Sequence, residues 1–126
     1  MATELQIRNA RTNEVIAPFV KVADNPWTRM VGLLGKKALP PDQALLIRPC
    51  SSVHTFFMRF AMDAIFIDRE NRVLKVVQKM RPFRFAGARR SRAVIEFMGG
   101  ALERMHIEEG DQLTITEAAE SKLEAG

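Results

Sequence analysis

The sequence predicts a compact single-domain α+β fold that is mainly β, a barrel-like antiparallel sheet with one or two short helices. Three observations predict this fold class. The length of 126 residues suits one domain with an ordinary core. Seven or eight short apolar runs are separated by turn-forming residues. Two of these runs, Asp63–Asp68 and Val73–Met80, are joined by a short polar turn, as in a β-hairpin.

The expected strands follow these apolar runs along the chain. They are Glu4–Arg8, Val15–Val22, Ala44–Arg48, Val53–Met58, Asp63–Asp68, Val73–Met80, Ala93–Met98 and Gln112–Thr116. Pro18 interrupts the second run, and because proline has no N–H donor it predicts an edge position or a bulge. Asn71 in the hairpin turn is expected to adopt the left-handed conformation.

Two helical segments are expected. Asn25 and Pro26 begin the first, with asparagine as N-cap and proline in the first turn, and an apolar stripe runs to Gly35. After the break at Gly99-Gly100, Ala101–Ile107 forms a helical turn or two. We expect one β-rich domain over residues 1–116 and a frayed polar tail over residues 117–126.

The positive charge is concentrated in one segment. The net charge is +4, from 19 Lys and Arg against 15 Asp and Glu, while the stretch Arg81–Arg92 holds five arginines and no acid. The rest of the chain is slightly acidic, which argues against a long nucleic-acid footprint. A single cysteine, a charged amino terminus and the lack of a long apolar run predict a cytoplasmic protein that does not enter a membrane.

The motifs resemble a known family in their order along the chain. Arg29 precedes Gly32-Leu33, Phe57-Met58-Arg59 leads to Asp63, and a hairpin is followed by Val94–Glu96, Gly99-Gly100 and Gly110-Asp111. This order is similar to the prokaryotic "domain of unknown function" family numbered 192, over about Val15 to Ile115. The segment Ser52–Arg59 resembles a proteobacterial branch, although Arg59 stands where many members carry lysine. The resemblance implies a compact, mainly β fold and no established activity.

Ionisable and apolar residues are concentrated between Cys50 and Asp68, which makes this stretch the candidate site. We expect a concavity between the 54–63 corner and the arginine stretch, selecting an anionic group. Its ligand-binding residues are predicted to be His54, Phe57, Met58, Arg59, Asp63, Arg89 and Arg90. Asp63 has a structural alternative, capping backbone N–H groups or pairing with Arg29 or Arg59. Glu96, a single acid in an apolar strand, is expected either in a structural ion pair, the role also expected of Arg29, or exposed.

The predicted function is a small cytoplasmic binding module for an anionic small molecule or protein partner. A hydrolase-like enzyme using His54 with Cys50 or Asp63 is the first alternative, although four extended residues would separate Cys50 from His54 by about 13 Å. Whether the protein is an enzyme stays open. The second alternative is a nucleic-acid or protein-interaction surface on residues 81–92, where Phe83 and Phe85 alternate with arginines. Two histidines and one cysteine give no metal-ligand pattern, and no cofactor is expected.

Overall fold

The computed structural model describes residues 5–23, 43–49, 52–54, 61–81 and 85–117. The elements within these ranges are nine strands and one short 3-10 helix. In chain order they are β1 (Leu5–Asn9), β2 (Glu14–Ala23), β3 (Gln43–Ile47), β4 (Ser52–His54), β5 (Met62–Ile67), β6 (Val73–Met80), β7 (Phe85–Gly87), β8 (Ala93–Met98), η1 (Ala101–Arg104) and β9 (Leu113–Glu117). The predicted mainly β fold is confirmed.

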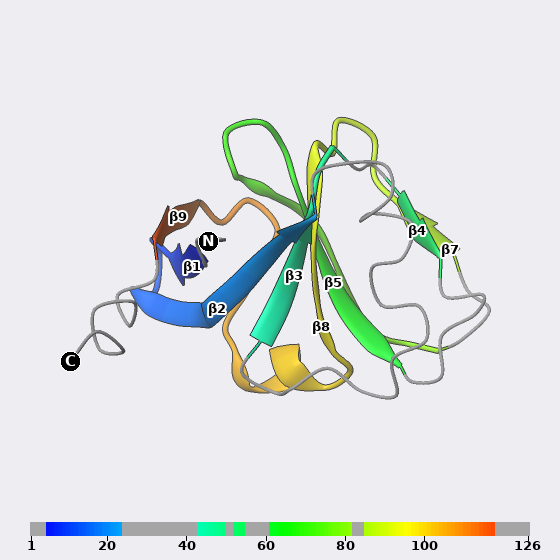
Figure 1. Ribbon diagram of the computed structural model, residues 1–126, viewed down its shortest axis with the longest axis horizontal. Coiled ribbons are helices and arrows are strands. Elements are labelled where there is room, and N and C mark those ends of the chain that lie inside the picture. The colour runs from blue at the N-terminus through cyan, green and yellow to red at the C-terminus, as the bar shows by residue number, and fades with distance from the viewer. Residues whose placement is uncertain (1–4, 24–42, 50–51, 55–60, 82–84, 118–126) are drawn as a thin grey trace.

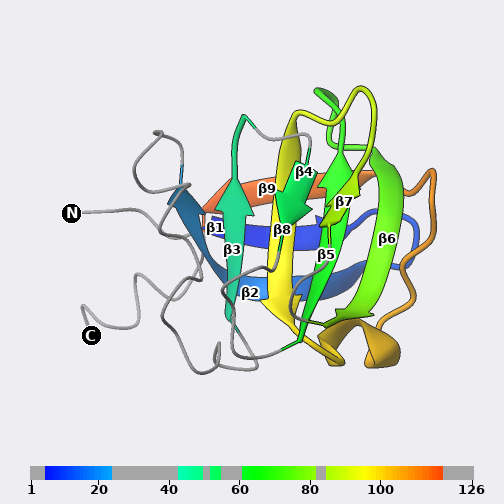
Figure 2. The ribbon, with the colours of Figure 1, turned by 90° about the vertical axis from the view of Figure 1, so that its right-hand side faces the viewer.

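Seven strands form one curled sheet in the order β6-β5-β8-β3-β2-β1-β9. The sheet folds over on itself, so that β3, β8, β5 and β6 cross in front of β1, β2 and β9 (Figures 1 and 2). The long strand β2 belongs to the bend between the two layers. The result is a half-barrel, and β4 and β7 pair separately as a two-stranded sheet.

The pairing of β2 with β3 is parallel, which departs from the predicted antiparallel sheet. Parallel neighbours need a long crossover, and residues 24–42 supply the length for one. Pro18 lies at a register shift, because Leu5 and Ile7 of β1 oppose Val20 and Ala17 of β2. The bulge is therefore the correct alternative for Pro18, since β2 lies inside the sheet between β1 and β3.

The two edge strands of the sheet, β6 and β9, meet at one end of the half-barrel. Arg72 and Gln112 form an isolated antiparallel bridge. Beside it, Val73 N–H donates to the Asp111 carbonyl at 2.8 Å and Leu113 N–H donates to the Asn71 carbonyl at 3.0 Å. These bonds satisfy backbone groups that an open sheet edge would leave unpaired, and they fix the β5–β6 hairpin against β9.

The side chains of the sheet form two cores, one on each face. Between the layers lie, among others, Ile7, Leu46, Ile65, Ile95 and Phe97. On the outer face, Met62, Ala64, Phe66, Met80 and Val94 pack with Ala86 of β7. In Figure 2 the β4–β7 pair lies in front of β5 and β8, over this second core. Because both faces of β5 are covered, all six of its residues are buried, as is usual for a central strand with layers on both sides.

The hairpin between β5 and β6 agrees with the prediction, and Asn71 has a positive φ of 66°. The segment after Gly99-Gly100 is a single 3-10 turn, shorter than predicted, and Gly100 takes the left-handed conformation with φ of 94°. Strand β7 was not predicted, because its three residues lie inside the arginine-rich stretch. The predicted helix beginning at Asn25 lies outside the described residues.

Candidate functional site

Several predicted site residues lie outside the part of the chain that the structure describes: Arg29, Cys50, Phe57, Met58 and Arg59. For His54 the backbone is described. It ends β4 and stands opposite Phe85 of β7. Strand β4 and the arginine-rich stretch are therefore neighbours in space at this point.

Arg89 and Arg90 lie at the other end of this two-stranded sheet. Because β4 and β7 are antiparallel, Ser52 opposes Gly87, and the two arginines follow Gly87 in a turn. Both are exposed, and Arg90 has a positive φ of 71°. The register places them beyond Ser52, away from His54.

Asp63 is fully buried and bonded to the main chain. Its Oδ1 accepts the N–H of Lys79 at 2.7 Å, its Oδ2 accepts the N–H of Leu102 at 2.8 Å, and both oxygens accept the N–H of Gly100 at 3.1 Å. The carboxylate thus satisfies donors at the β6 bulge and at the start of η1. This is the capping role that the sequence left open for Asp63.

Glu96 is 3% exposed and lies on the outer face of the sheet, between Leu45 and Ala64 on the neighbouring strands. Within the described residues its Oε1 has no hydrogen-bond partner. Burial raises the pKa of Glu96 to about 8. The exposed alternative for Glu96 is therefore wrong, because both faces of β8 are covered.

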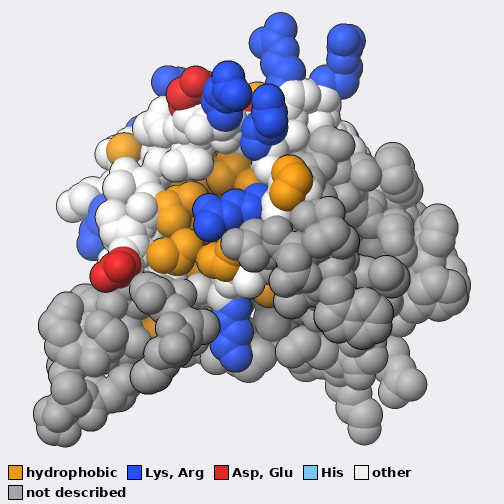
Figure 3. All heavy atoms as spheres, turned by 45° about the horizontal axis from the view of Figure 1, so that its top comes forward, with side chains coloured by type: hydrophobic (Ala, Val, Ile, Leu, Met, Phe, Trp, Pro, Cys, Tyr) orange, Lys and Arg blue, Asp and Glu red, His pale blue; other side chains and the backbone are white. Residues whose placement is uncertain are grey.

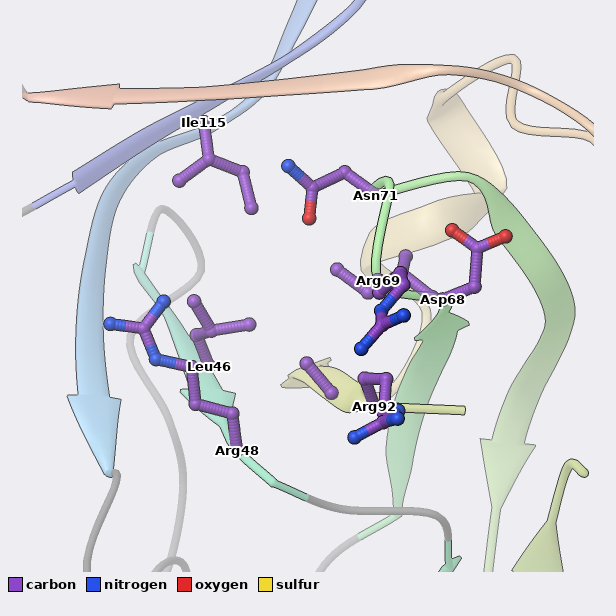
Figure 4. A pocket seen from close by; sticks show the side chains of 9 residues that line it. Leu46, Arg48, Asp68, Arg69, Asn71, Arg92 and Ile115 are labelled. Carbon is purple, nitrogen blue, oxygen red and sulfur yellow. The ribbon is translucent and has the colours of Figure 1, made fainter. Parts of the chain in front are cut away.

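A pocket of about 180 Å³ opens at the end of the half-barrel where the β5–β6 hairpin meets β9. Five elements or connections contribute to it: the end of β3, the end of β5, the hairpin turn, the start of β8 and β9 (Figure 4). Its lining residues are Leu46, Arg48, Ile67, Asp68, Arg69, Asn71, Arg92, Ala93 and Ile115. We call this cavity the barrel-mouth pocket.

Three arginines belong to the lining of the barrel-mouth pocket, and Asp68 is the one acid among the described residues of this lining. The Asp68 Oδ1 accepts the N–H groups of Glu70 and Arg72, both at 2.9 Å, so this carboxylate stabilises its own turn. In Figure 4 it points away from the cavity. Among the described residues, neither Arg69 nor Arg92 has a side-chain ion pair or hydrogen bond, which leaves their guanidinium donors for a ligand.

The main chain holds Arg92 and Asn71 in place. Arg92 N–H donates to the Ile67 carbonyl at 2.8 Å, which extends the β5–β8 pairing to the pocket rim. The Asn71 carbonyl accepts from Leu113, and its side-chain amide lies between Ile115 and the arginines in Figure 4. In Figure 4 the oxygen of this amide faces the cavity and the nitrogen faces Ile115, and a half-turn of the amide group would present its N–H₂ donors to an anion.

The floor of the pocket is apolar. Leu46, Ile67 and Ala93 belong to the core between the layers, and Ile115 packs against it half-buried. Figure 3, which brings this end of the molecule forward, shows hydrophobic side chains around a basic one, with further basic side chains standing at the rim. The pocket therefore combines cationic donors outside with an apolar surface inside.

Comparisons with known proteins show the family to which this sequence belongs. The sequence matches the model of the DUF192 family, described as "Uncharacterized ACR", over residues 7–115. The chain belongs to this family. A UPF0127 protein of Pyrococcus furiosus is 32% identical over 111 residues, covering 83% of this chain and 93% of the relative. The DUF192 resemblance inferred from the sequence motifs is thus confirmed, and this relative is archaeal.

Two solved structures share the DUF192 fold of this chain. A protein from Sinorhizobium meliloti, provisionally named a transcription regulator, has a TM-score of 0.77 at 18% identity and covers 90% of this chain and 93% of its own. A protein of unknown function from Novosphingobium aromaticivorans has a TM-score of 0.75 at 19% identity, and the match covers 88% of this chain and 83% of that protein. At these identities the likeness shows the fold alone.

Two further observations concern only the part of this DUF192 chain that the structure describes. No helix in it has the length and apolar character needed to cross a membrane. In the same ranges, no three or more His, Cys, Asp or Glu side chains gather in a group that could hold a metal ion.

Arg48 and Arg69 were not among the predicted site residues, and Arg92 was expected only as part of the arginine stretch. A signal existed, because Arg48 ends a predicted strand, Arg69 directly follows one and Arg92 directly precedes one. What could not be inferred was that β8 pairs with both β3 and β5, which brings these strand ends together at one end of the barrel.

Proposed function

We propose that this protein is a binding module that recognises an anionic group in the barrel-mouth pocket. The observation that carries the proposal is that Arg69 and Arg92 lie close together at one small cavity, with Arg48 also in the lining and the Asp68 carboxylate turned away. Guanidinium groups bind carboxylates and phosphates through paired N–H donors.

The size of the cavity limits what it binds. A volume of about 180 Å³ corresponds to roughly six water molecules at the volume each occupies in the liquid. A small organic or inorganic anion fits in this volume. This supports a small-molecule ligand or a single side chain of a partner, and it gives the nucleic-acid alternative no support.

The residues predicted from the sequence remain a separate proposal for an anion site at the 54–63 corner, namely His54, Phe57, Met58 and Arg59, with Arg89 and Arg90. Of these, Arg89 and Arg90 follow the end of β7 that pairs with Ser52, away from His54. The barrel-mouth pocket is a different place, at the meeting of β3, β5, β8 and β9.

Calorimetric titration with acetate, inorganic phosphate and 3-methylbutanoate tests the proposal. At least one of these anions should bind saturably at low salt, and the affinity should fall at least tenfold in the double variant R69A/R92A. Both arginines are exposed, so the variant should fold with nearly unchanged stability. R104A, an exposed arginine of η1 near the opposite end of the barrel, is the matched control and should bind as the wild type does (Figure 1). Equal affinity in R69A/R92A and the wild type would remove the proposal.

A further inference from the structure

The barrel-mouth pocket has two chemically different halves, and this division specifies the ligand more closely than its charge does. At the rim stand the guanidinium groups and the Asn71 amide. On the inside, Leu46, Ile67 and Ala93 are 1%, 1% and 7% exposed. A purely inorganic anion would contact the rim groups alone and would leave Ile115, the half-buried apolar residue of the lining, without a ligand contact.

The floor residues are part of the main core, which makes their position rigid. Leu46 lies opposite Ile95 across β3 and β8, and Ile67 lies opposite Ala93 across β5 and β8. Ile115 reaches the cavity from β9, across the opening, where it pairs with Ile7 of β1. An apolar group of a ligand placed here would contact side chains on four strands, β3, β5, β8 and β9, which are already fixed by the sheet.

We infer that the ligand class of this pocket is a small organic acid, a carboxylate carrying a compact aliphatic group of about three to five carbons. The inference rests on the proposed function, because it uses the same pocket. The carboxylate would lie between Arg69 and Arg92, where a planar anion can accept paired N–H donors. The aliphatic group would point inward, over Ala93 and towards Ile115, so that the ligand spans the rim and the floor.

Charge and volume both favour this class over a larger polyanion. Among the described lining residues, Arg69 and Arg92 have no side-chain partner, and the one described acid, Asp68, is bonded to its own turn. The cavity of about 180 Å³ holds a ligand of roughly six to ten non-hydrogen atoms. A branched short-chain carboxylate has this size, and its single charge does not require the Asp68 carboxylate to be neutralised.

A homologous series of carboxylates tests the inference. Acetate, propanoate, butanoate and 3-methylbutanoate are titrated into the protein, with inorganic phosphate and 3-methylbutanol as probes of the charge alone and the apolar group alone. Affinity should rise about fourfold for each methylene or methyl group that enters the floor, since each buried CH₂ contributes about 0.8 kcal/mol. The alcohol should bind at least tenfold more weakly than 3-methylbutanoate.

The possible results separate this inference from the proposed function. If phosphate or acetate binds as tightly as 3-methylbutanoate, the apolar floor is not used and the inference is overturned, while an anion site remains. If the alcohol matches the acid, the arginines are not used and both fail. Should no probe bind, both fail as well.

A variant of the floor gives an independent check that does not depend on the rim. In I115V one methyl group is removed from a half-buried side chain, which the fold should tolerate at a loss of stability of about 1 kcal/mol. The ratio of the affinity for 3-methylbutanoate to the affinity for acetate should be about two- to threefold smaller in I115V than in the wild type. The affinity for phosphate should be the same in both proteins. An unchanged gain in I115V would place the aliphatic group elsewhere and overturn the inference.

Discussion

Asp63 and Glu96 are buried acids on adjacent strands, one register position apart, and they face opposite sides of the sheet. Asp63 stands opposite Phe97 and faces the core between the layers, whereas Glu96 stands opposite Ala64 and faces the outer core. The two carboxyl groups have contrasting environments. Three main-chain N–H groups donate to Asp63, while Oε1 of Glu96 has no donor among the described residues.

Replacing Asp63 with alanine should be strongly destabilising. The change leaves the N–H groups of Lys79, Gly100 and Leu102 without acceptors next to a buried space, which we expect to lower the free energy of unfolding by about 3 to 5 kcal/mol. Urea denaturation measures the effect. E103Q, a change of an exposed acid on η1, is the control and should change the stability by less than about 1 kcal/mol. A similar small effect for D63A would show that these bonds do not hold η1 in place.

Glu96 should make the protein less stable as the pH rises. Its pKa is raised from 4.5 to about 8 by burial. Between these values the folded state keeps a proton that the unfolded state releases, so stability falls from about pH 4.5 to 8 and is lowest above pH 8. The total loss is roughly 5 kcal/mol if the whole shift is expressed. Denaturation of E96Q at pH 5, 7 and 9 should lack this decline, and an equal decline in E96Q and wild type would contradict the assignment.

Asp111 should make the protein less stable as the pH falls, which is the opposite of the dependence expected from Glu96. Arg11 Nε donates to its Oδ1 at 2.6 Å, and the buried Asn9 amide and the Glu108 N–H donate to its Oδ2 at 2.9 and 2.8 Å. The Arg11 bond, with these others, lowers the pKa of Asp111 to about 2. Stability from this group is complete above pH 3.8 and is lost as the pH falls through about 2. Because Arg11 is 44% exposed, we expect D111N to lose only about 1 to 2 kcal/mol at pH 7.

The free energy of unfolding measured at a series of pH values below pH 4 checks this directly. Wild type should lose stability between pH 4 and 2 more steeply than D111N does. Identical slopes for the two proteins would mean that the Asn9–Arg11–Asp111 network is not formed in solution.

Two variants of Asn71 distinguish its role in the backbone turn from its proposed role in binding. Its φ of 66° favours asparagine or glycine, so N71A should lose about 1 kcal/mol of stability while N71G should stay close to wild type. Both variants lack the amide that lies at the pocket, and both should bind the anion more weakly by a similar factor. If N71G keeps full affinity, the amide is not a ligand.

Much of the fold could be predicted because its signals are local. The β5–β6 hairpin and the left-handed Asn71 follow from turn chemistry, and the alternation along β8 accounts for Ile95 and Phe97 on one face and Val94 on the other. The features that were missed depend on long-range pairing. Nothing near Ala44 indicates that β3 runs parallel to β2 and antiparallel to β8.

The site was harder to predict for the same reason. Arg48, Arg69 and Arg92 are separated by 21 and 23 positions in the sequence, and only the strand order β5-β8-β3 brings them to one cavity. The dense stretch from Cys50 to Asp68 drew attention because its polar residues are adjacent in sequence. Of these, Asp63 is engaged by the main chain, which local composition could not distinguish from ligand binding.

The pH dependence of binding distinguishes the barrel-mouth pocket from the 54–63 corner. The pocket's cations are arginines, which stay charged at every working pH, so affinity for a carboxylate should be constant between pH 6 and 8. A site that used the His54 imidazolium would lose affinity over this interval. Calorimetry at pH 6, 7 and 8 measures the difference, and a steep loss would favour the corner.

The central claim, that an anion binds between Arg69 and Arg92 at the barrel mouth, is tested most directly by two-dimensional amide NMR during a titration with 3-methylbutanoate. The largest shifts should fall on the amides of Asn71, Arg92, Ala93 and Ile115, which come from the β5–β6 turn, the start of β8 and β9. They should disappear in R69A/R92A and persist in R104A. Shifts confined to His54–Arg59 and Arg89–Arg90, or none at saturating ligand, would contradict the claim.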